Sequence, residues 1–128
     1  MIIYHPKMKM NILSSQYVQQ IDVYPMVIDL LNIENQKIFS FGRSPFAQKE
    51  KYYIYYTNGE YLLMIGNYLS KYKQDATIEL FNVVEDQGLK NNIANQHKEI
   101  TQKHIEFTQA FIQQYNNTII ENKTTVSK

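Results

Sequence analysis

The sequence contains no cysteine in its 128 residues. This absence excludes disulfides, zinc ribbons, thiol nucleophiles and iron–sulfur clusters, although it does not fix the cellular compartment. No apolar run approaches the roughly 18 residues that are needed to span a bilayer. Residues 1–6 have neither a basic region nor a long apolar stretch, so they do not predict a signal peptide. The sequence therefore leaves the localisation unknown.

An excess of charge of either sign is also missing. The 13 basic and 12 acidic residues give a net charge of +1. Without a basic excess there is no electrostatic basis for binding nucleic acid or an anionic membrane, and we predict neither contact. With 44% apolar residues, the chain can bury the core of one small domain, with or without a few elements of a larger one.

The first third of the chain indicates elements that belong to a larger domain. Residues 2–5 form a short apolar run that ends at Pro6, which is typical of a buried strand. A helix is predicted next, and residues 38–46 form an aromatic loop that contains a glycine and a proline. We interpret residues 1–46 as a remnant of a larger α/β domain.

The predicted helix covers residues 23–31. Asp22 is the expected N-cap, because its carboxylate can accept hydrogen bonds from the free amides of the first turn. Pro25 falls within that turn, where a missing amide hydrogen costs little. The apolar residues form a single stripe, and Asn32 is the expected terminator.

The middle of the chain predicts an antiparallel meander. Asn58-Gly59 separates two β-rich runs and is the strongest short-range hairpin signal, because both residues tolerate positive φ. Two further tight turns give four strands in all, at residues 52–57, 60–65, 68–73 and 77–83. The partial alternation of polar and apolar residues favours one covered face and one partly wet face, with tyrosine hydroxyls at the boundary.

The last predicted element is an amphipathic helix at residues 100–120 that lies across this sheet. Its apolar stripe recurs at spacings of three and four, at Ile100, His104, Phe107, Phe111, Tyr115 and Ile119. We assign residues 47–120 to a small domain of sheet and helix, and expect residues 121–128 to fray. The predicted fold class is α+β: a leading strand and helix from a truncated α/β domain, then a four-stranded antiparallel meander packed by a long C-terminal helix.

The three histidines do not predict a metal site. His97 and His104 are seven residues apart, whereas a helical pair of metal ligands is spaced by three or four. His104 lies on the apolar stripe, which favours a structural histidine that faces the sheet. His5, at the end of the first predicted strand, is a candidate for a residue that faces a substrate cleft.

Arg43, in the aromatic loop, is the second substrate-cleft candidate. A guanidinium can bind an anionic group through two parallel hydrogen bonds. The alternative is that Arg43 pairs with a carbonyl or carboxylate and holds the loop in place. Asp22 is accounted for as a helix cap, and Glu85-Asp86 as part of a turn. We therefore predict no catalytic residue and no metal ligand in this chain.

Several segments resemble, in order, the end of a protein of the sulfatase or alkaline-phosphatase superfamily, closest to its lipoteichoic acid synthase and phosphoglycerol transferase branch. The matching segments lie within about residues 2–94: Ile2-Ile3-Tyr4-His5-Pro6, residues 20–31, Phe41-Gly42-Arg43-Ser44-Pro45-Phe46, the Asn58-Gly59 hairpin, Leu80-Phe81-Asn82 with Glu85-Asp86, and Asn91-Asn92-Ile93-Ala94. Met26 stands where the family usually has threonine, and Pro45 where it usually has leucine. We interpret both as packing positions.

The resemblance implies a parent protein that acts on a phosphate or sulfate ester with a divalent metal such as Mn, Mg, Zn or Ca. The family's nucleophile and metal ligands have no counterpart here and are expected upstream, and half of such a site performs no chemistry. This chain is then a non-catalytic C-terminal domain without a cofactor of its own, and its partner is the upstream catalytic domain. Proteins of this family are typically membrane-anchored or exported.

Two alternatives stay open beside this interpretation. The chain could be a free-standing binding or assembly module that kept only the C-terminal sheet, or an independent small enzyme of another class, for which no nucleophile–base set is visible. If the strand at residues 2–5 and the helix at residues 23–31 evolved to be covered, their apolar faces should be exposed in the isolated chain. We therefore expect a homo-oligomer that forms through these elements.

Overall fold

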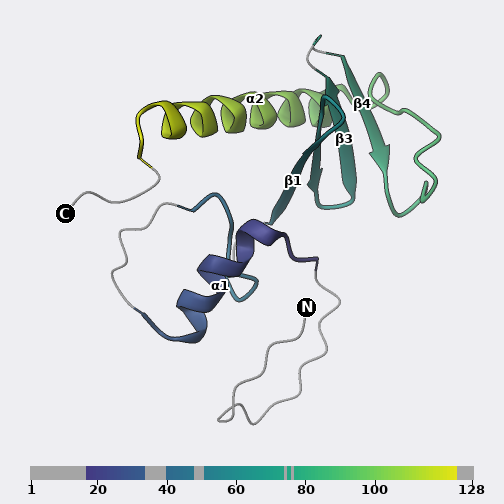
Figure 1. Cartoon of the computed structure of the whole chain (residues 1–128). Helices are drawn as coiled ribbons and strands as arrows, with labels where there is room; N and C mark the ends of the chain where they lie inside the picture. The colour runs from purple at the N-terminus through teal and green to yellow at the C-terminus, as the bar shows by residue number, and fades with distance from the viewer. Residues whose placement is uncertain (1–16, 34–39, 48–50, 74, 76, 124–128) are drawn as a thin grey trace.

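A computed structural model describes residues 17–33, 40–47, 51–73, 75 and 77–123. In chain order it contains a short 3-10 helix η1 (Gln20–Asp22), helix α1 (Val23–Leu30), four strands and helix α2 (Lys98–Ile120). Figure 1 shows α2 running across the sheet, with α1 below it. This arrangement confirms the predicted α+β fold with its meander and long C-terminal helix. The strand predicted at residues 2–5 lies outside the described residues.

The sheet is a meander of four antiparallel strands in the order β1-β2-β3-β4. The strands are β1 (Tyr52–Thr57), β2 (Glu60–Ile65), β3 (Tyr68–Lys73) and β4 (Ile78–Asn82). Asn58 and Gly59 have φ values of 51° and 81°, as the predicted hairpin requires. The first three strands match their predicted bounds, and β4 is one residue shorter at each end. Short turns fix this register locally, with Tyr56 opposite Tyr61 and Tyr61 opposite Tyr72.

The two faces of the sheet differ as expected. Leu63, Ser70 and Leu80 are neighbours on the face that α2 covers, and all three are fully buried. The opposite face carries ion pairs near the Asn58-Gly59 end, where Lys73 lies 3.5 Å from Glu60. The fully buried side chains of the sheet lie on the covered face, so the centre of the core lies between the sheet and α2; on the opposite face Phe81 is also buried, at 3% exposed.

The stripe predicted for α2 is correct only in its first half. His104 is buried, but so are Thr101 and Thr108, which the apolar pattern did not identify. Tyr115 and Ile119, both predicted to be in the stripe, are exposed. The reason is length: the helix has 23 residues, and in Figure 1 it continues beyond the edge of the sheet. The sheet therefore covers the N-terminal part of the helix, and the C-terminal part is covered in places by other segments: Thr118 is buried, and the Tyr115 ring packs against Phe41 of the aromatic loop.

Helix α1 is short and ends as the sequence predicts. Asn32 adopts a positive φ of 50° and donates to the carbonyl of Asp29, while the amide of Ile33 donates to the carbonyl of Ile28. This pair of bonds is the Schellman motif, here with asparagine in the left-handed position. The helix therefore stops at Leu30, one residue before the predicted end.

Candidate functional site

The best-organised polar contacts near α1 converge on Asp22. The side chain is only 6% exposed. One carboxylate oxygen accepts from the backbone amide of Arg43 (2.8 Å) and the other from the backbone amide of Gln19 (3.0 Å). We call this arrangement the Asp22 clamp. It joins the start of α1 to the aromatic loop, which is 21 residues away in the sequence.

The clamp corrects the expected role of Asp22. The residue does occupy the N-cap position of α1, but its carboxylate makes no cap hydrogen bond to the first turn. Its backbone is helical (φ −80°, ψ −17°), because it also ends η1. An N-cap side chain normally starts from an extended backbone, which directs it over the free amides. From a helical backbone, the carboxylate is instead available to the loop.

Gly42 lets the loop approach this closely. A Cβ atom at this position would lie 1.8 Å from the carbonyl oxygen of Ile21, so no other residue fits without a backbone shift. The amide of Gly42 donates to the hydroxyl of Ser40 at 3.1 Å, which stabilises the bend. The loop therefore packs directly on the backbone of η1.

Gln19 connects the same region to the edge of the sheet. Its side-chain nitrogen donates to the carbonyl of Tyr52 (3.0 Å), and its side-chain oxygen accepts from the amide of Ile54 (2.6 Å). Among the described residues β1 has a strand neighbour only on the β2 side, and these backbone groups point away from β2, so they need a partner when they are not in water. A single side-chain amide fills both roles.

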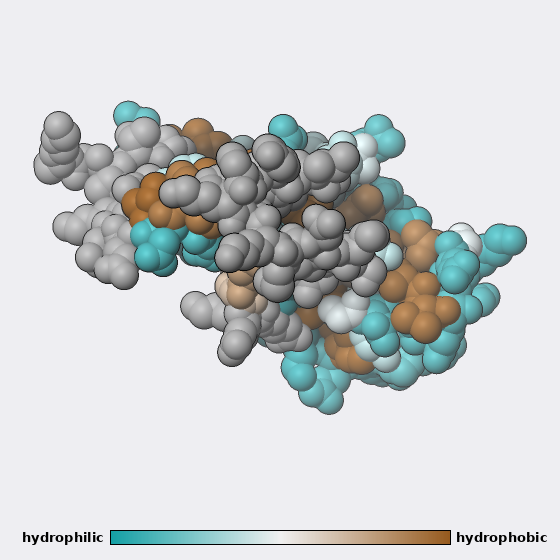
Figure 2. Space-filling view, turned by 90° about the horizontal axis from the view of Figure 1, so that it is seen from below, coloured by the Kyte–Doolittle hydropathy of each residue, from teal (hydrophilic) through white to brown (hydrophobic). Residues whose placement is uncertain are grey.

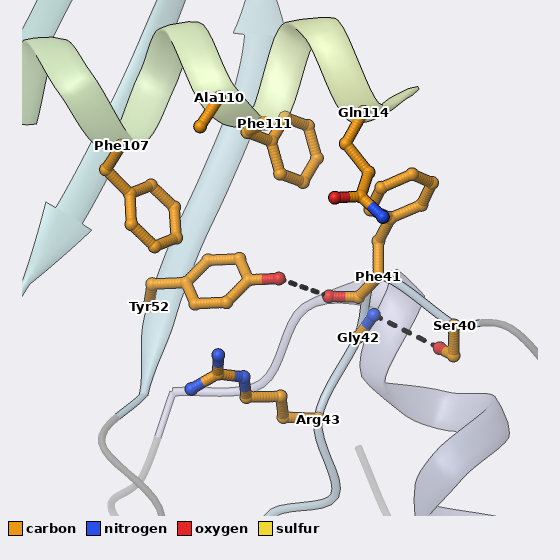
Figure 3. Close-up of a pocket in the computed structure, with 9 residues that line it drawn as sticks. All are labelled: Ser40, Phe41, Gly42, Arg43, Tyr52, Phe107, Ala110, Phe111 and Gln114. Carbon is orange, nitrogen blue, oxygen red and sulfur yellow. Dashed lines mark hydrogen bonds between the residues drawn. The ribbon is translucent and has the colours of Figure 1, made fainter. Parts of the chain in front are cut away.

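A shallow cavity of about 320 Å³ lies where the loop, β1 and α2 meet. Figure 3 shows Phe107, Phe111 and Gln114 reaching it from α2, opposite Tyr52 and Phe41. The Tyr52 hydroxyl donates to the carbonyl of Phe41 at 2.5 Å, and its ring centroid lies 4.7 Å from that of Phe107. Burial raises the pKa of Tyr52, and the nearby Arg43 opposes that shift. The hydroxyl is therefore a neutral donor that closes the cavity wall.

Arg43 is the one cleft candidate that the structure describes. Its guanidinium carbon lies 4.7 Å from the centroid of the Tyr52 ring, an arrangement that favours a cation–π contact. The side chain is exposed and lines the cavity, while its backbone amide belongs to the Asp22 clamp. His5, the other candidate, lies outside the described residues.

His104 and Ser70 form a buried pair between α2 and β3. The imidazole Nδ1 is 2.9 Å from the Ser70 hydroxyl oxygen, and the Ser70 hydroxyl donates to the carbonyl of Leu63 at 3.4 Å. Burial lowers the pKa of His104. A serine next to a histidine can be a nucleophile with its base. Because Ser70 is 0% exposed, no substrate reaches it, and the pair serves packing as the stripe predicted.

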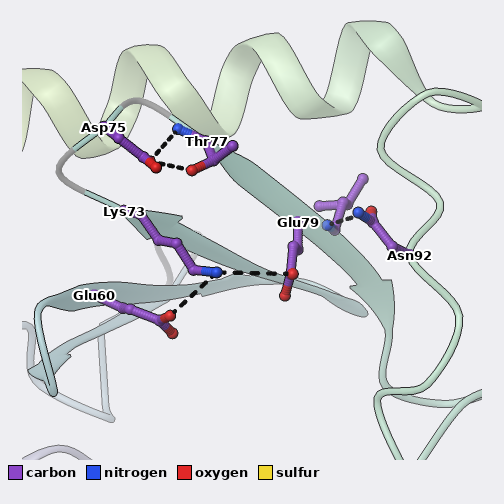
Figure 4. Close-up of polar contacts among 7 residues, drawn as sticks. Glu60, Lys73, Asp75, Thr77, Glu79 and Asn92 are labelled. Carbon is purple, nitrogen blue, oxygen red and sulfur yellow. Dashed lines mark hydrogen bonds and ion pairs between the residues drawn. The ribbon is translucent and has the colours of Figure 1, made fainter.

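Several other charged groups of the described residues form surface contacts. In Figure 4, Lys73 reaches Glu60 and Glu79 across the strands, and the carboxylate of Asp75 accepts from Thr77. The carboxylate of Asp86 accepts from the amides of Lys90 and Asn91, in keeping with the turn predicted there. Within the described ranges, no three histidine or carboxylate side chains gather where they could hold a metal ion.

Comparison with known proteins gives no relative: no protein-family model and no curated protein matches this chain. Among the described segments, no helix is both long enough and apolar enough to cross a bilayer.

Proposed function

We propose that this chain is a non-catalytic supporting domain, the C-terminal part of a sulfatase-like hydrolase or phosphoglycerol transferase. In this proposal a larger α/β domain covers α1 and carries out metal-assisted chemistry on a phosphate or sulfate ester. The sheet and α2 hold α1 and the aromatic loop in place beside that domain. The proposal combines the order of the resembling segments with one feature of the structure, the surface of α1.

That surface is apolar on nearly every side, although α1 lies at the outside of the molecule. Of its eight residues only Met26 is buried, while Val27 is 42% exposed and Leu31, which caps the helix, is 58% exposed. Asp29 is the one charged residue in the helix. Figure 2 views the molecule from below, the side on which α1 lies in Figure 1, and shows brown hydrophobic atoms at the surface there.

A helix that is apolar all round is normally buried, either in a large protein or in a membrane. Eight residues rise about 12 Å, which is far less than the roughly 30 Å of a bilayer core. A protein surface is therefore the matching partner. Covering one large aliphatic side chain contributes about 1.5–3 kcal/mol when burial is complete. Several such side chains along α1 supply enough for a stable interface within one protein.

The junction of α1, the aromatic loop and β1 suits a supporting role. The Asp22 clamp, Gly42 and Gln19 tie α1 and the loop to β1, so the orientation of α1 is set by the sheet. In the proposed parent protein, Arg43 and His5 are the residues nearest to the substrate cleft. They would position an anionic substrate, and the parent's own residues would hold the metal and the nucleophile.

Two measurements test the proposal. The purified chain, assayed with Mn²⁺ or Zn²⁺, should hydrolyse no phosphate monoester, phosphodiester or aryl sulfate, and turnover would overturn the proposal. The coding sequence directly upstream should encode a domain with the family's Asp-His motif. If it encodes no such domain, the free-standing binding or assembly module is the better explanation.

The interface itself is tested with the upstream domain expressed as a separate chain. Calorimetric titration should show binding to this chain, and Leu31→Lys should weaken it about tenfold or more, because a charge would enter an apolar contact. Ile120→Lys, at an 80% exposed position at the end of α2, is the matched control and should bind like the wild type. Equal binding by Leu31→Lys would rule out α1 as the contact.

A further inference from the structure

The face of the sheet opposite α2 carries a row of apolar side chains. The row contains one residue from each strand, paired in register: Tyr53, Met64, Leu69 and Phe81. Because successive side chains of a strand point to opposite faces, this row lies on the face that α2 does not cover. Phe81, at the β4 end, is 3% exposed, and the Lys71 nitrogen lies 4.9 Å from its ring centroid. The other three side chains are only partly buried, so the rest of the row remains in contact with solvent.

The segment before α1 turns the β1 end of this row into a groove. Residues 17–21 pass beside β1, held there by hydrogen bonds from the Gln19 side chain to the β1 backbone. The Tyr17 ring meets the Tyr53 ring edge-on, with centroids 5.9 Å apart and an angle of 79° between the ring planes. The cavity between this segment and the sheet has a volume of about 460 Å³. We call it the tyrosine groove, and the described residues that line it include Tyr17, Tyr53, Tyr55, Met64 and Leu69.

The lining of the tyrosine groove suits an uncharged ligand with few polar groups. None of the described residues that line it carries a charge. Burial raises the pKa of Tyr53, so this hydroxyl stays neutral at physiological pH. The side-chain amide of Gln19 is already engaged at both ends, with the carbonyl of Tyr52 and the amide of Ile54. The described lining then offers tyrosine hydroxyls and the Gln20 amide, which is too little for a sugar, because each buried polar group needs a partner.

The same lining favours aromatic rings over an alkyl chain. Tyr17 and Tyr55 are 70% and 65% exposed, so their rings are accessible to a ligand. Aromatic rings attract one another in edge-on and offset arrangements, which an alkyl chain cannot form. The thioether sulfur of Met64 likewise makes favourable contacts with aromatic rings. The volume of about 460 Å³ leaves room for one ring or two fused rings.

We propose that the tyrosine groove binds a flat, uncharged aromatic molecule of one or two rings. In this site the ligand lies on Met64 and Leu69, with the rings of Tyr17 and Tyr53 beside it and its polar edge toward the hydroxyl of Tyr55. The inference does not rest on the proposed function, because it uses one face of the sheet and not the surface of α1. The ligand is also different in chemistry from the anionic ester assigned to the parent protein.

Three probes test the chemistry of the ligand by calorimetric titration at neutral pH. 2-Naphthol is uncharged, and 2-naphthalenesulfonate has the same two rings with a negative charge. The uncharged probe should bind about tenfold more tightly or better, because the described lining has no cation to replace the water that the sulfonate loses. 1-Octanol, uncharged but without a ring, should also bind more weakly than 2-naphthol. The proposal is overturned if 2-naphthol does not bind or if either of the other probes binds equally well.

Two matched substitutions locate the bound probe. Tyr55→Glu places a carboxylate in the groove at a 65% exposed position, so it should weaken 2-naphthol binding about tenfold or more without altering the fold. Leu31→Glu places the same charge on the surface of α1, at a 58% exposed position, and should bind 2-naphthol like the wild type. In NMR spectra, 2-naphthol should shift the methyl signals of Met64 and Leu69. Binding that is lost in Leu31→Glu but kept in Tyr55→Glu, or shifts confined to α1, would overturn the inference and leave the proposed function standing.

Discussion

The sheet with α2 and the short helix α1 bury their apolar side chains to different degrees. Between the sheet and α2, Leu63 and Leu80 are fully buried. In α1 only Met26 is buried, and the helix is held instead by polar contacts to Asp22 and by the close approach of Gly42. Since burial is the dominant stabilising term in folding, the sheet and α2 form a self-sufficient core. Helix α1 depends on that core for its position and leaves most of its own apolar side chains exposed.

The sharpest way to test this difference is the same substitution in both regions. Leu63→Ala should reduce the free energy of unfolding by about 2–5 kcal/mol, because it leaves a cavity in a fully packed site. Leu31→Ala, the matched control, removes the same atoms from a 58% exposed position and should change stability by less than about 0.5 kcal/mol. Urea unfolding of both variants provides the comparison. Equal losses would show that α1 belongs to the core.

Gly42→Ala should loosen α1 and the aromatic loop while leaving the sheet and α2 intact. The added methyl group meets the carbonyl of Ile21, and the backbone shift it requires should cost about 1–3 kcal/mol in the junction. Hydrogen exchange should show lost protection at the amides of Gln19 and Arg43, with the amides of β2 and β3 unchanged. In Gly88→Ala the new methyl group meets only the flexible side chain of Lys90, so this control should be silent. Simultaneous loss of protection in both regions would contradict the division.

The same division explains which features the sequence could predict. The hairpin at Asn58-Gly59 and the terminator Asn32 depend on the conformational preferences of one or two residues, and both were predicted correctly. The Asp22 clamp depends on a contact across 21 residues, and no local pattern pointed to it. Helix capping was the nearest local explanation for Asp22, and it was wrong because η1 makes the backbone helical there.

The helix α2 was predicted correctly, but the prediction of which of its residues are buried was partly wrong, for a related reason. A pattern of apolar residues gives the face of a helix but not the length over which another element covers it. Thr101 and Thr108 are buried on the part of the helix that contacts the sheet through His104 and Gln109, whereas Tyr115 is 46% exposed and packs against Phe41 of the aromatic loop. The hydroxyl of Thr101 can be buried because it donates to the carbonyl of Ala94 at 3.0 Å. The cavity at the junction likewise needed Tyr52, Phe41 and α2 to be brought together by the fold.

The smallest predicted effect is a pH dependence of stability that arises from a histidine in the core and not from one at the surface. Burial lowers the pKa of His104 below its ordinary value of about 6.5, so the unfolded chain takes up this proton first as the pH falls. Stability from this group is fully present above pH ~6.5 and is lost progressively below it, toward the lower pKa of the folded state. Urea midpoints should therefore decrease between about pH 7 and pH 5.

The matched pair of variants assigns this slope to one residue. His104→Gln keeps a side chain that can hydrogen-bond to Ser70 but cannot be protonated, so the midpoint should become nearly independent of pH in this range. His97 is exposed, with its ring 6.0 Å from that of Tyr68, and His97→Gln should keep the slope of the wild type. A slope that persists in His104→Gln would mean that the proton is taken up outside the core. The contact between α2 and the sheet would then not be sensitive to acid.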